Sequence, residues 1–215
     1  MAYLLDEKMA FPHPSLADED GLLAIGGDLS VERLLLAYAH GIFPWFSDDT
    51  PILWYAPHER FVLFPKELYI SKSMKQFMRR TTFTLRHNTA FIDVVQQCAT
   101  VERLGQDGTW ITQDMQAAYL ELHQQGHAHS FEVFNPEGQL VGGLYGVQVG
   151  RIFCGESMFA KVSNASKLAL IYLCQAFNFE LIDCQIHSEH LASLGAKMMP
   201  GEEYYRILQQ QQTTT

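Results

Sequence analysis

The sequence predicts an α+β fold, and residues 139–177 give the clearest signal for it. Residues 139–149 and 151–159 are rich in β-branched and aromatic side chains, and the Gly150–Arg151 pair between them suits a tight turn, so they are predicted to form two paired strands. After Asn164, a favourable N-cap residue, apolar side chains recur at helical spacing. The chain has 215 residues, 47% of them hydrophobic, which is enough for a packed core in one large domain or two smaller ones.

The N-terminal part is predicted to contain one helix between two loops. Proline-rich coil begins at residue 11. Ser30 is predicted to cap a helix that ends at Gly41. Trp45 lies in the loop that follows, where an aromatic side chain is either part of a small core or a platform for a ligand.

Three more helices and a strand are predicted before the hairpin. The helices start near Ser71 or Ser73, near Asn88 and at Thr112. Residues 127–134 then have the composition of a strand, and a turn at residues 135–138 leads into the hairpin.

A last strand is predicted at residues 181–186. Alternation along a strand would place Asp183 and Gln185 on the same face, so both could contact one ligand. The alternative is an edge strand whose polar face meets solvent. The sequence leaves these two interpretations open.

Glu156 lies in the middle of the second hairpin strand, among apolar residues such as Phe153 and Met158. A carboxylate that points inward there needs a cationic partner, because burying an unpaired charge is costly. Spacing alone favours the other interpretation, in which Glu156 points to solvent from a half-exposed sheet.

A basic segment stands out in an otherwise acidic chain. The formal net charge is -9 at pH 7, yet residues 59–86 contain seven Lys and Arg against two Glu. Lys72, Lys75 and Arg79 fall on one stripe of the helix predicted there, with Arg80 beside them. Such a stripe suits the phosphates of a polyanion, although charged helix faces are often only solvated.

Other patterns exclude several classes of protein. No apolar run reaches the roughly 18 residues that a membrane span needs, and the N-terminus has acidic residues and prolines where a signal peptide has a basic start. The four cysteines lie far apart without a CxxC pair, which favours reduced thiols in a cytoplasm. His123 and His127 are separated by Gly126, a predicted helix end, so with His129 nearby we still expect no metal site.

Several motifs together resemble one family. Residues 21–46 (GLLAIGGDLSVERLLLAYAHGIFPWF), the hairpin with its helix, and the later DCQ at 183–185 are similar to the leucyl/phenylalanyl-tRNA–protein transferases. The resemblance implies an enzyme that moves Leu or Phe, with Met as a third candidate donor, from its tRNA to proteins with an N-terminal Arg or Lys. Proteins marked in this way enter N-end-rule (N-degron) degradation.

The resemblance also implies an architecture. We expect a small N-terminal domain at residues 1–63 and a larger catalytic domain at residues 64–208. The larger domain would have a mixed sheet like that of the GCN5-related acetyltransferases (GNAT-like). Residues 209–215 are low-complexity and are predicted to be disordered. The resemblance further suggests a cytoplasmic monomer that needs no cofactor and no membrane.

Roles follow from the resemblance one residue at a time. Trp45 and Trp110 would flank the terminal adenosine of the tRNA, and Glu156 would hold the α-ammonium group of the donor. Asp183 and Gln185 would lie at the acceptor amine, with Asp183 either removing a proton or orienting Gln185. The remaining substrate-binding residues would be Tyr119 and, around an apolar pocket for the donor side chain, Phe153, Met158, Leu170, Tyr172 and Phe177. The tRNA phosphates would meet Lys72, Lys75, Arg79 and Arg80.

The chemistry of such a transfer fits the motifs that the sequence has and lacks. An aminoacyl ester is already activated, so the reaction needs positioning, an acceptor for one proton and stabilisation of an oxyanion. Two alternatives are a non-catalytic binder of tRNA ends or basic N-termini, and an acyl-CoA N-acyltransferase. The second expects a glycine-containing pyrophosphate loop after the hairpin, but residues 160–167 (AKVSNASK) contain no glycine.

Overall fold

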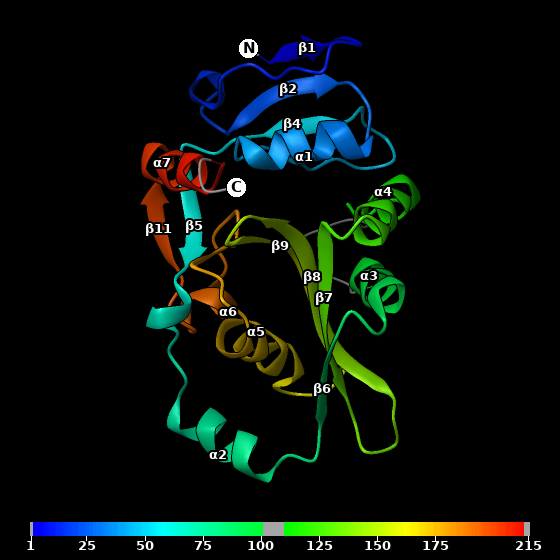
Figure 1. Cartoon of the computed structure of the whole chain (residues 1–215), viewed down its shortest axis with the longest axis vertical. Coiled ribbons are helices and arrows are strands. Elements are labelled where there is room, and N and C mark those ends of the chain that lie inside the picture. The colour runs from blue at the N-terminus through cyan, green and yellow to red at the C-terminus, as the bar shows by residue number, and fades with distance from the viewer. Residues whose placement is uncertain (1, 101–109, 213–215) are drawn as a thin grey trace.

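Two β-sheets organise the chain in the computed structural model, which describes residues 2–100 and 110–212. A four-stranded sheet has the order β1-β2-β4-β3, and a seven-stranded sheet has the order β11-β5-β10-β9-β8-β7-β6 (Figure 1). In the larger sheet β9 and β10 run parallel, whereas β8 and β9 run antiparallel. The predicted α+β class with a mixed sheet is confirmed.

The strands are β1 (Tyr3–Leu5), β2 (Leu22–Gly26), β3 (Phe43–Pro44), β4 (Leu53–Tyr55), β5 (Glu59–Leu63), β6 (Thr84–His87), β7 (Ala128–Phe134), β8 (Leu140–Val149), β9 (Ile152–Ala160), β10 (Leu181–Asp183) and β11 (Lys197–Pro200). The α-helices are α1 (Val31–Ala39), α2 (Lys72–Arg80), α3 (Phe91–Thr100), α4 (Gln113–Gln124), α5 (Ala165–Ala176), α6 (Glu189–Ala192) and α7 (Gly201–Gln212). Two short 3-10 helices lie at Pro14–Leu16 and Pro65–Glu67.

The helices cover both faces of the seven-stranded sheet (Figure 1). Helix α5 packs on one face against β7, β8 and β9, in a hydrophobic cluster that also includes Met74 of α2. Helices α3 and α4 pack on the other face, in a cluster that continues into α1 and the N-terminal sheet. Helix α7 lies beside α1, so the C-terminal part of the chain joins the small N-terminal unit to the large sheet.

The glycines of β8 permit close packing against helix α5 and strand β9. A Cβ atom on Gly142 would lie 2.5 Å from the Cβ of Ala165 at the start of α5. A Cβ atom on Gly146 would lie 2.1 Å from the carbonyl oxygen of Cys154 on β9. Because real side chains cannot approach so closely, the glycine-rich sequence of this strand reflects the contacts that α5 and β9 make with it.

The divergence of β9 from β10 opens the sheet at the centre of the molecule. The two strands pair through Ile182↔Phe153 and Asp183↔Cys154, and β10 then ends. Strand β9 continues to Ala160 with β8 on its other side. The residues of β9 beyond Cys154 therefore face a space that β10 does not fill.

The structure differs from the sequence predictions in several local details. Asn164 precedes α5 in a left-handed conformation and makes no side-chain cap hydrogen bond, and Asn88 lies three residues before α3. The strand predicted at 181–186 ends at Asp183. Helix α7 continues to Gln212, so residues 209–212 are helical and not part of a disordered tail.

The division of the chain between the sheets also differs slightly from the predicted boundary. Strand β5, placed in the N-terminal domain by a boundary after residue 63, pairs with β10 and β11 in the larger sheet. Residues 102–109, whose polar sequence predicts a loop, lie outside the described residues. So do residues 213–215, the last of the predicted tail.

Candidate active site

Asp183, at the end of β10, is held by a buried ion pair. The Nε and Nη2 atoms of Arg60 on β5 donate to Asp183 Oδ1 and Oδ2 at 2.8 and 2.6 Å. The hydroxyl of Tyr204 on α7 donates to Oδ2 at 2.8 Å, and the backbone N–H of Gln185 donates to Oδ1 at 2.9 Å. Both Asp183 and Arg60 are almost completely buried. Four hydrogen bonds thus occupy the two oxygens of this carboxylate.

Arg60 connects this ion pair to the small N-terminal unit. Its Nη1 atom donates to the carbonyl oxygen of Gly41 at 2.9 Å, and its guanidinium lies 4.7 Å from the ring centre of Phe43 and 4.8 Å from that of Tyr204. Burial opposes the positive charge, but attraction to Asp183 outweighs it, so the pKa of Arg60 is raised above its usual value. The guanidinium of Arg60 therefore keeps its positive charge although it is buried.

Gln185 links the two carboxylates. Its φ angle is 63°, in the left-handed region, which a non-glycine residue adopts rarely. The bond from its N–H to Asp183 holds this turn, and its Nε2 atom donates to Glu156 Oε1 at 2.7 Å. Gln185 therefore reaches the site by a turn rather than by strand alternation.

Glu156 is buried, so the interpretation that it points to solvent is wrong. It is 7% exposed, and Tyr119 on α4 donates to its Oε2 at 2.6 Å. None of the described Lys or Arg side chains forms an ion pair with it. Burial raises the pKa of Glu156 to about 7, although the neighbouring hydroxyl groups of Tyr119 and Tyr38 and the amide of Gln185 act in the opposite direction. The cationic partner that burial requires is absent from the described part of the chain.

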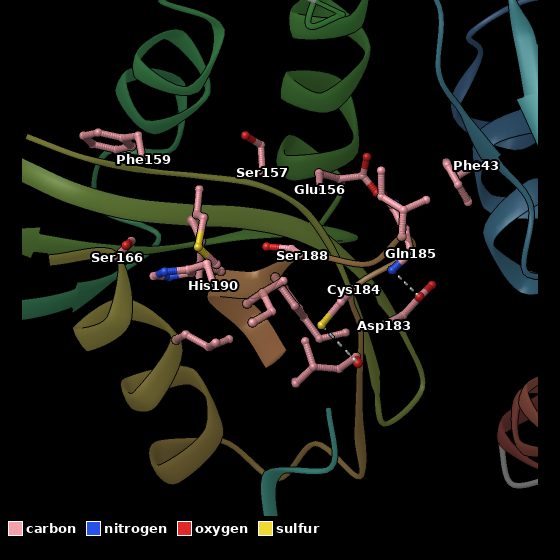
Figure 2. A pocket seen from close by; sticks show the side chains of 18 of the residues that line it. Phe43, Glu156, Ser157, Phe159, Ser166, Asp183, Cys184, Gln185, Ser188 and His190 are labelled. Carbon is pink, nitrogen blue, oxygen red and sulfur yellow. Dashed lines mark hydrogen bonds between the residues drawn. The ribbon is translucent and has the colours of Figure 1, made fainter. Parts of the chain in front are cut away.

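A cavity of about 450 Å³ lies where β9 and β10 separate. Glu156, Asp183 and Gln185 line it together, and Phe43 reaches it from the N-terminal unit (Figure 2). The other predicted site residues that line it are Trp45, Trp110, Phe153, Met158 and Leu170. The cavity thus combines apolar walls, two indole rings and a carboxylate without a counter-ion.

Comparison with known proteins identifies the family. Residues 62–209 match the model for leucyl/phenylalanyl-tRNA protein transferase, and residues 27–58 match the model for the N-terminal domain of that transferase. The chain belongs to the leucyl/phenylalanyl-tRNA protein transferase family. A leucyl/phenylalanyl-tRNA–protein transferase of Flavobacterium johnsoniae is 52% identical, with 96% of this chain and 98% of the relative covered. One of Syntrophus aciditrophicus is 53% identical, with 95% and 86% covered.

One solved structure resembles this chain in its fold although the two sequences differ widely. The crystal structure of FemX aligns with a TM-score of 0.50 at 12% identity, covering 87% of this chain and 74% of FemX. At this identity the similarity concerns the fold alone.

Three residues that the family resemblance assigned to the substrate lie away from the cavity. Tyr119 is completely buried behind Glu156 and supports that carboxylate. Tyr172 and Phe177 pack against each other and against Phe131, with ring centres 4.9 to 6.1 Å apart. They belong to an aromatic cluster beside α5, so they do not form the lining of this pocket.

The basic stripe of this transferase-family chain lies on α2. Lys72, Lys75, Arg79 and Arg80 are all exposed, and Ser71 caps the helix through a bond to the Met74 N–H. Helix α2 lies at the end of the molecule opposite to the N-terminal sheet (Figure 1). Arg60, which also belongs to the basic segment, is instead buried in the ion pair.

Three site residues were not recognised from the sequence. The sequence predicted Arg60 only as part of the basic segment at residues 59–86, and it predicted no role for Tyr38 or Tyr204. Arg60 beside the apolar run Phe61–Leu63 is a signal that could have been found, because a cation in a buried strand needs a carboxylate partner.

The remaining candidates for chemistry are occupied by structural contacts. His123 Nδ1 bonds to the carbonyl oxygen of Ala128, and His129 Nδ1 bonds to the side-chain amide of Asn88. None of the four cysteines, all of them among the described residues, forms a disulfide. Among residues 2–100 and 110–212 no helix has the length and apolar character needed to cross a membrane.

Glu156→Gln is expected to make the protein more stable at alkaline pH. The native pKa is about 7 against 4.5 for an ordinary Glu, so the native state binds this proton more tightly than the unfolded state does. The stability that the protonated carboxyl contributes is present below pH 4.5 and is lost as the pH rises through 7, a change of ~3 kcal/mol. The excess stability of the variant should therefore grow between pH 5 and 8, as measured by urea unfolding.

The exposed Glu137→Gln variant is the matched control and should show no such trend. A Glu156→Gln protein less stable than the parent at pH 8 would contradict the assignment of Glu156 as an uncompensated carboxylate.

Proposed function

We propose that this chain transfers Leu or Phe, with Met as a third candidate donor, from aminoacyl-tRNA to the α-amine of proteins with an N-terminal Arg or Lys. The product would be marked for N-end-rule (N-degron) degradation. Family membership supports the transfer reaction. The observation that carries the proposal is the cavity in which an apolar lining meets a buried carboxylate without a cation.

The donor end of the tRNA fits this cavity in chemical terms. Its α-ammonium group would pair with Glu156 and supply the missing positive charge. The Leu or Phe side chain would contact Phe153, Met158 and Leu170. Trp45 and Trp110 would stack on the terminal adenosine, because indole rings stack well on bases.

Peptide-bond formation at this site requires no activated intermediate on the protein. The nitrogen of the acceptor attacks the ester carbon, the ester bond to the ribose breaks, and the proton lost by the nitrogen ends on the ribose oxygen that leaves. Gln185 uses one amide hydrogen for Glu156. Its second hydrogen would be available to the oxyanion, and its amide oxygen would be available to the acceptor amine.

Asp183 serves in this proposal to orient Gln185 rather than to remove a proton. A general base needs an oxygen free to accept the proton of the substrate. Both oxygens of Asp183 already accept two hydrogen bonds each, from Arg60, Tyr204 and Gln185. We therefore regard Asp183 as a positioning residue.

The finer features of the fold belong to the same proposal. We infer that the larger unit is a GNAT-like catalytic domain beside a small N-terminal domain, in a cytoplasmic monomer. Strand β5 belongs to the larger unit, so the boundary would lie before residue 59. An acyl-CoA N-acyltransferase is disfavoured because the turn after β9 has no glycine with which to hold a pyrophosphate. A non-catalytic binder is disfavoured because it would not need Gln185 in a strained conformation at Glu156.

The function is tested by transfer of labelled Leu or Phe from tRNA to a peptide that begins with Arg, with no other factor added. We expect the label in the peptide, and no transfer to a matched peptide that begins with Ala. Binding of the charged tRNA without any labelled peptide would establish the non-catalytic alternative.

Arg60→Lys should impair catalysis nearly as much as Asp183→Asn. A lysine at position 60 keeps the positive charge, and Asp183 is still present. The lysine cannot form the bidentate hydrogen bonds that Arg60 makes to the carboxylate, so Asp183 shifts and Gln185 loses its fixed orientation. A small misplacement of a positioned group can cost on the order of 10²-fold in kcat. We expect kcat for both variants to fall at least ~10-fold, measured at saturating tRNA and peptide, where the same assay also gives KM.

The two roles of Asp183 predict different results in this comparison. If Asp183 were the proton acceptor, Arg60→Lys would retain most of the parent kcat while Asp183→Asn would not.

Reversal of charge on α2 should weaken tRNA binding. In the Lys75→Glu/Arg79→Glu variant we expect lower affinity and a log–log salt slope shallower by about two, since each phosphate contact contributes about one unit. Filter binding across a salt series measures both. The control reverses two exposed charges elsewhere, Lys8→Glu/Arg206→Glu. Equal slopes for parent and α2 variant would mean that this stripe is only solvated.

A further inference from the structure

Two buried tyrosines form a chain that ends on Glu156. The hydroxyl groups of Tyr38 on α1 and Tyr119 on α4 are 2.6 Å apart, and that of Tyr119 is 2.6 Å from Glu156 Oε2. Tyr38 is 1% exposed and Tyr119 is completely buried, so solvent does not compete for these hydrogen bonds.

The number of phenol hydrogens determines the direction of these hydrogen bonds. A phenol has one hydrogen to donate, and Tyr119 donates it to the carboxylate. Tyr38 must then be the donor in its bond with Tyr119. The reverse direction would require a protonated Glu156 that donates to Tyr119. With Glu156 ionised, both phenol hydrogens have an acceptor in this chain of hydrogen bonds.

We propose that Tyr38 and Tyr119 are positioning residues that keep Glu156 ionised and correctly oriented for the α-ammonium group of the donor. This inference rests on the proposed function, because it assumes that Glu156 receives that group. It assigns to the small N-terminal unit a direct part in the reaction, since Tyr38 lies on α1 and its contact with Glu156 passes through Tyr119.

Groups on every element around Glu156 contribute to its charge state. Burial and the neighbouring Asp183 on β10 favour the neutral form, although Asp183 is itself paired with Arg60. Tyr119, Tyr38 and Gln185 favour the ionised form. The other neighbours are Cys154 on β9 and Tyr145 on β8, whose ring meets that of Tyr119 edge-on at 5.3 Å. Tyr119 therefore donates to Oε2 of the carboxylate, supported by Tyr38, whereas Gln185 donates to Oε1.

The test is the pH dependence of kcat/KM for the aminoacyl-tRNA, measured from pH 5.5 to 8.5 with an Arg-starting peptide. Loss of a hydrogen bond to a charged group raises the pKa of a carboxylate. We expect the rising limb of the pH profile to shift toward higher pH, by about one pH unit in Tyr119→Phe and by about half a unit in Tyr38→Phe. The rate should recover toward the parent value at pH 8.5, which a merely structural defect would not produce.

Tyr172→Phe is the control, because it removes a partly buried phenol hydroxyl from the cluster around Phe131, outside the lining of the cavity. Its profile should coincide with that of the parent. Unmoved profiles in Tyr38→Phe and Tyr119→Phe would overturn the inference, as would an equal shift in Tyr172→Phe.

Glu156→Gln separates this inference from the proposed function. If Glu156→Gln keeps the parent kcat/KM at every pH, Glu156 does not receive the donor and the inference falls with that role. If Glu156→Gln is impaired while the phenol variants keep the parent profile, only the inference fails.

Replacement of Tyr119 by 3,5-difluorotyrosine provides a second test that preserves the packing, should a Phe variant fail to fold. The more acidic phenol is a stronger donor, so the rising limb should move to lower pH. A limb that stays in place would overturn the inference.

Discussion

The ion pair between Arg60 and Asp183 is the interaction on which the rest of the site depends. Both charges are removed from water, and such a pair is tolerated only when the remaining donors and acceptors are satisfied. Gly41, Tyr204 and the N–H of Gln185 provide those contacts. These partners come from the end of α1, from α7 and from the turn after β10. The need to satisfy one buried ion pair therefore holds the N-terminal unit, the central sheet and the C-terminal helix in one arrangement.

The same ion pair distinguishes the two carboxylates of the cavity. Asp183 has a permanent cation and four hydrogen bonds, so it has little capacity left for a ligand. Glu156 instead receives hydrogen bonds from two neutral donors of the described chain, Tyr119 and Gln185. Gln185 contacts both, and its left-handed backbone is held by its N–H bond to Asp183. Because Gln185 contacts both carboxylates, the fixed position of Asp183 determines how Gln185 contacts Glu156.

Local sequence patterns predicted most helices and strands, whereas the contacts between side chains far apart in the sequence were not predictable from it. Ser30 and Thr112 cap helices as expected, since a cap depends on the next three residues only. Arg60 and Asp183 are 123 positions apart, and no periodicity relates them. Spacing favoured a solvent-facing Glu156 because it cannot reveal that Tyr119 covers that side of the strand. Tyr172 and Phe177 shared the apolar character of the pocket residues, but they face the Phe131 cluster.

A buried carboxylate without a cation destabilises a fold, so its surroundings indicate why it is kept. A protein cation beside Glu156 would remove the cost of burial, but it would also occupy the position proposed for the α-ammonium group of the donor. Hydroxyl and amide donors hold the carboxylate in place and leave its negative charge uncompensated. The charge can then be neutralised by the ligand, and part of the free energy lost in folding is regained on binding. In the proposed function the sheet thus carries two acids with opposite roles: Asp183 is neutralised within the protein, and Glu156 is left for the ammonium group of the donor to neutralise.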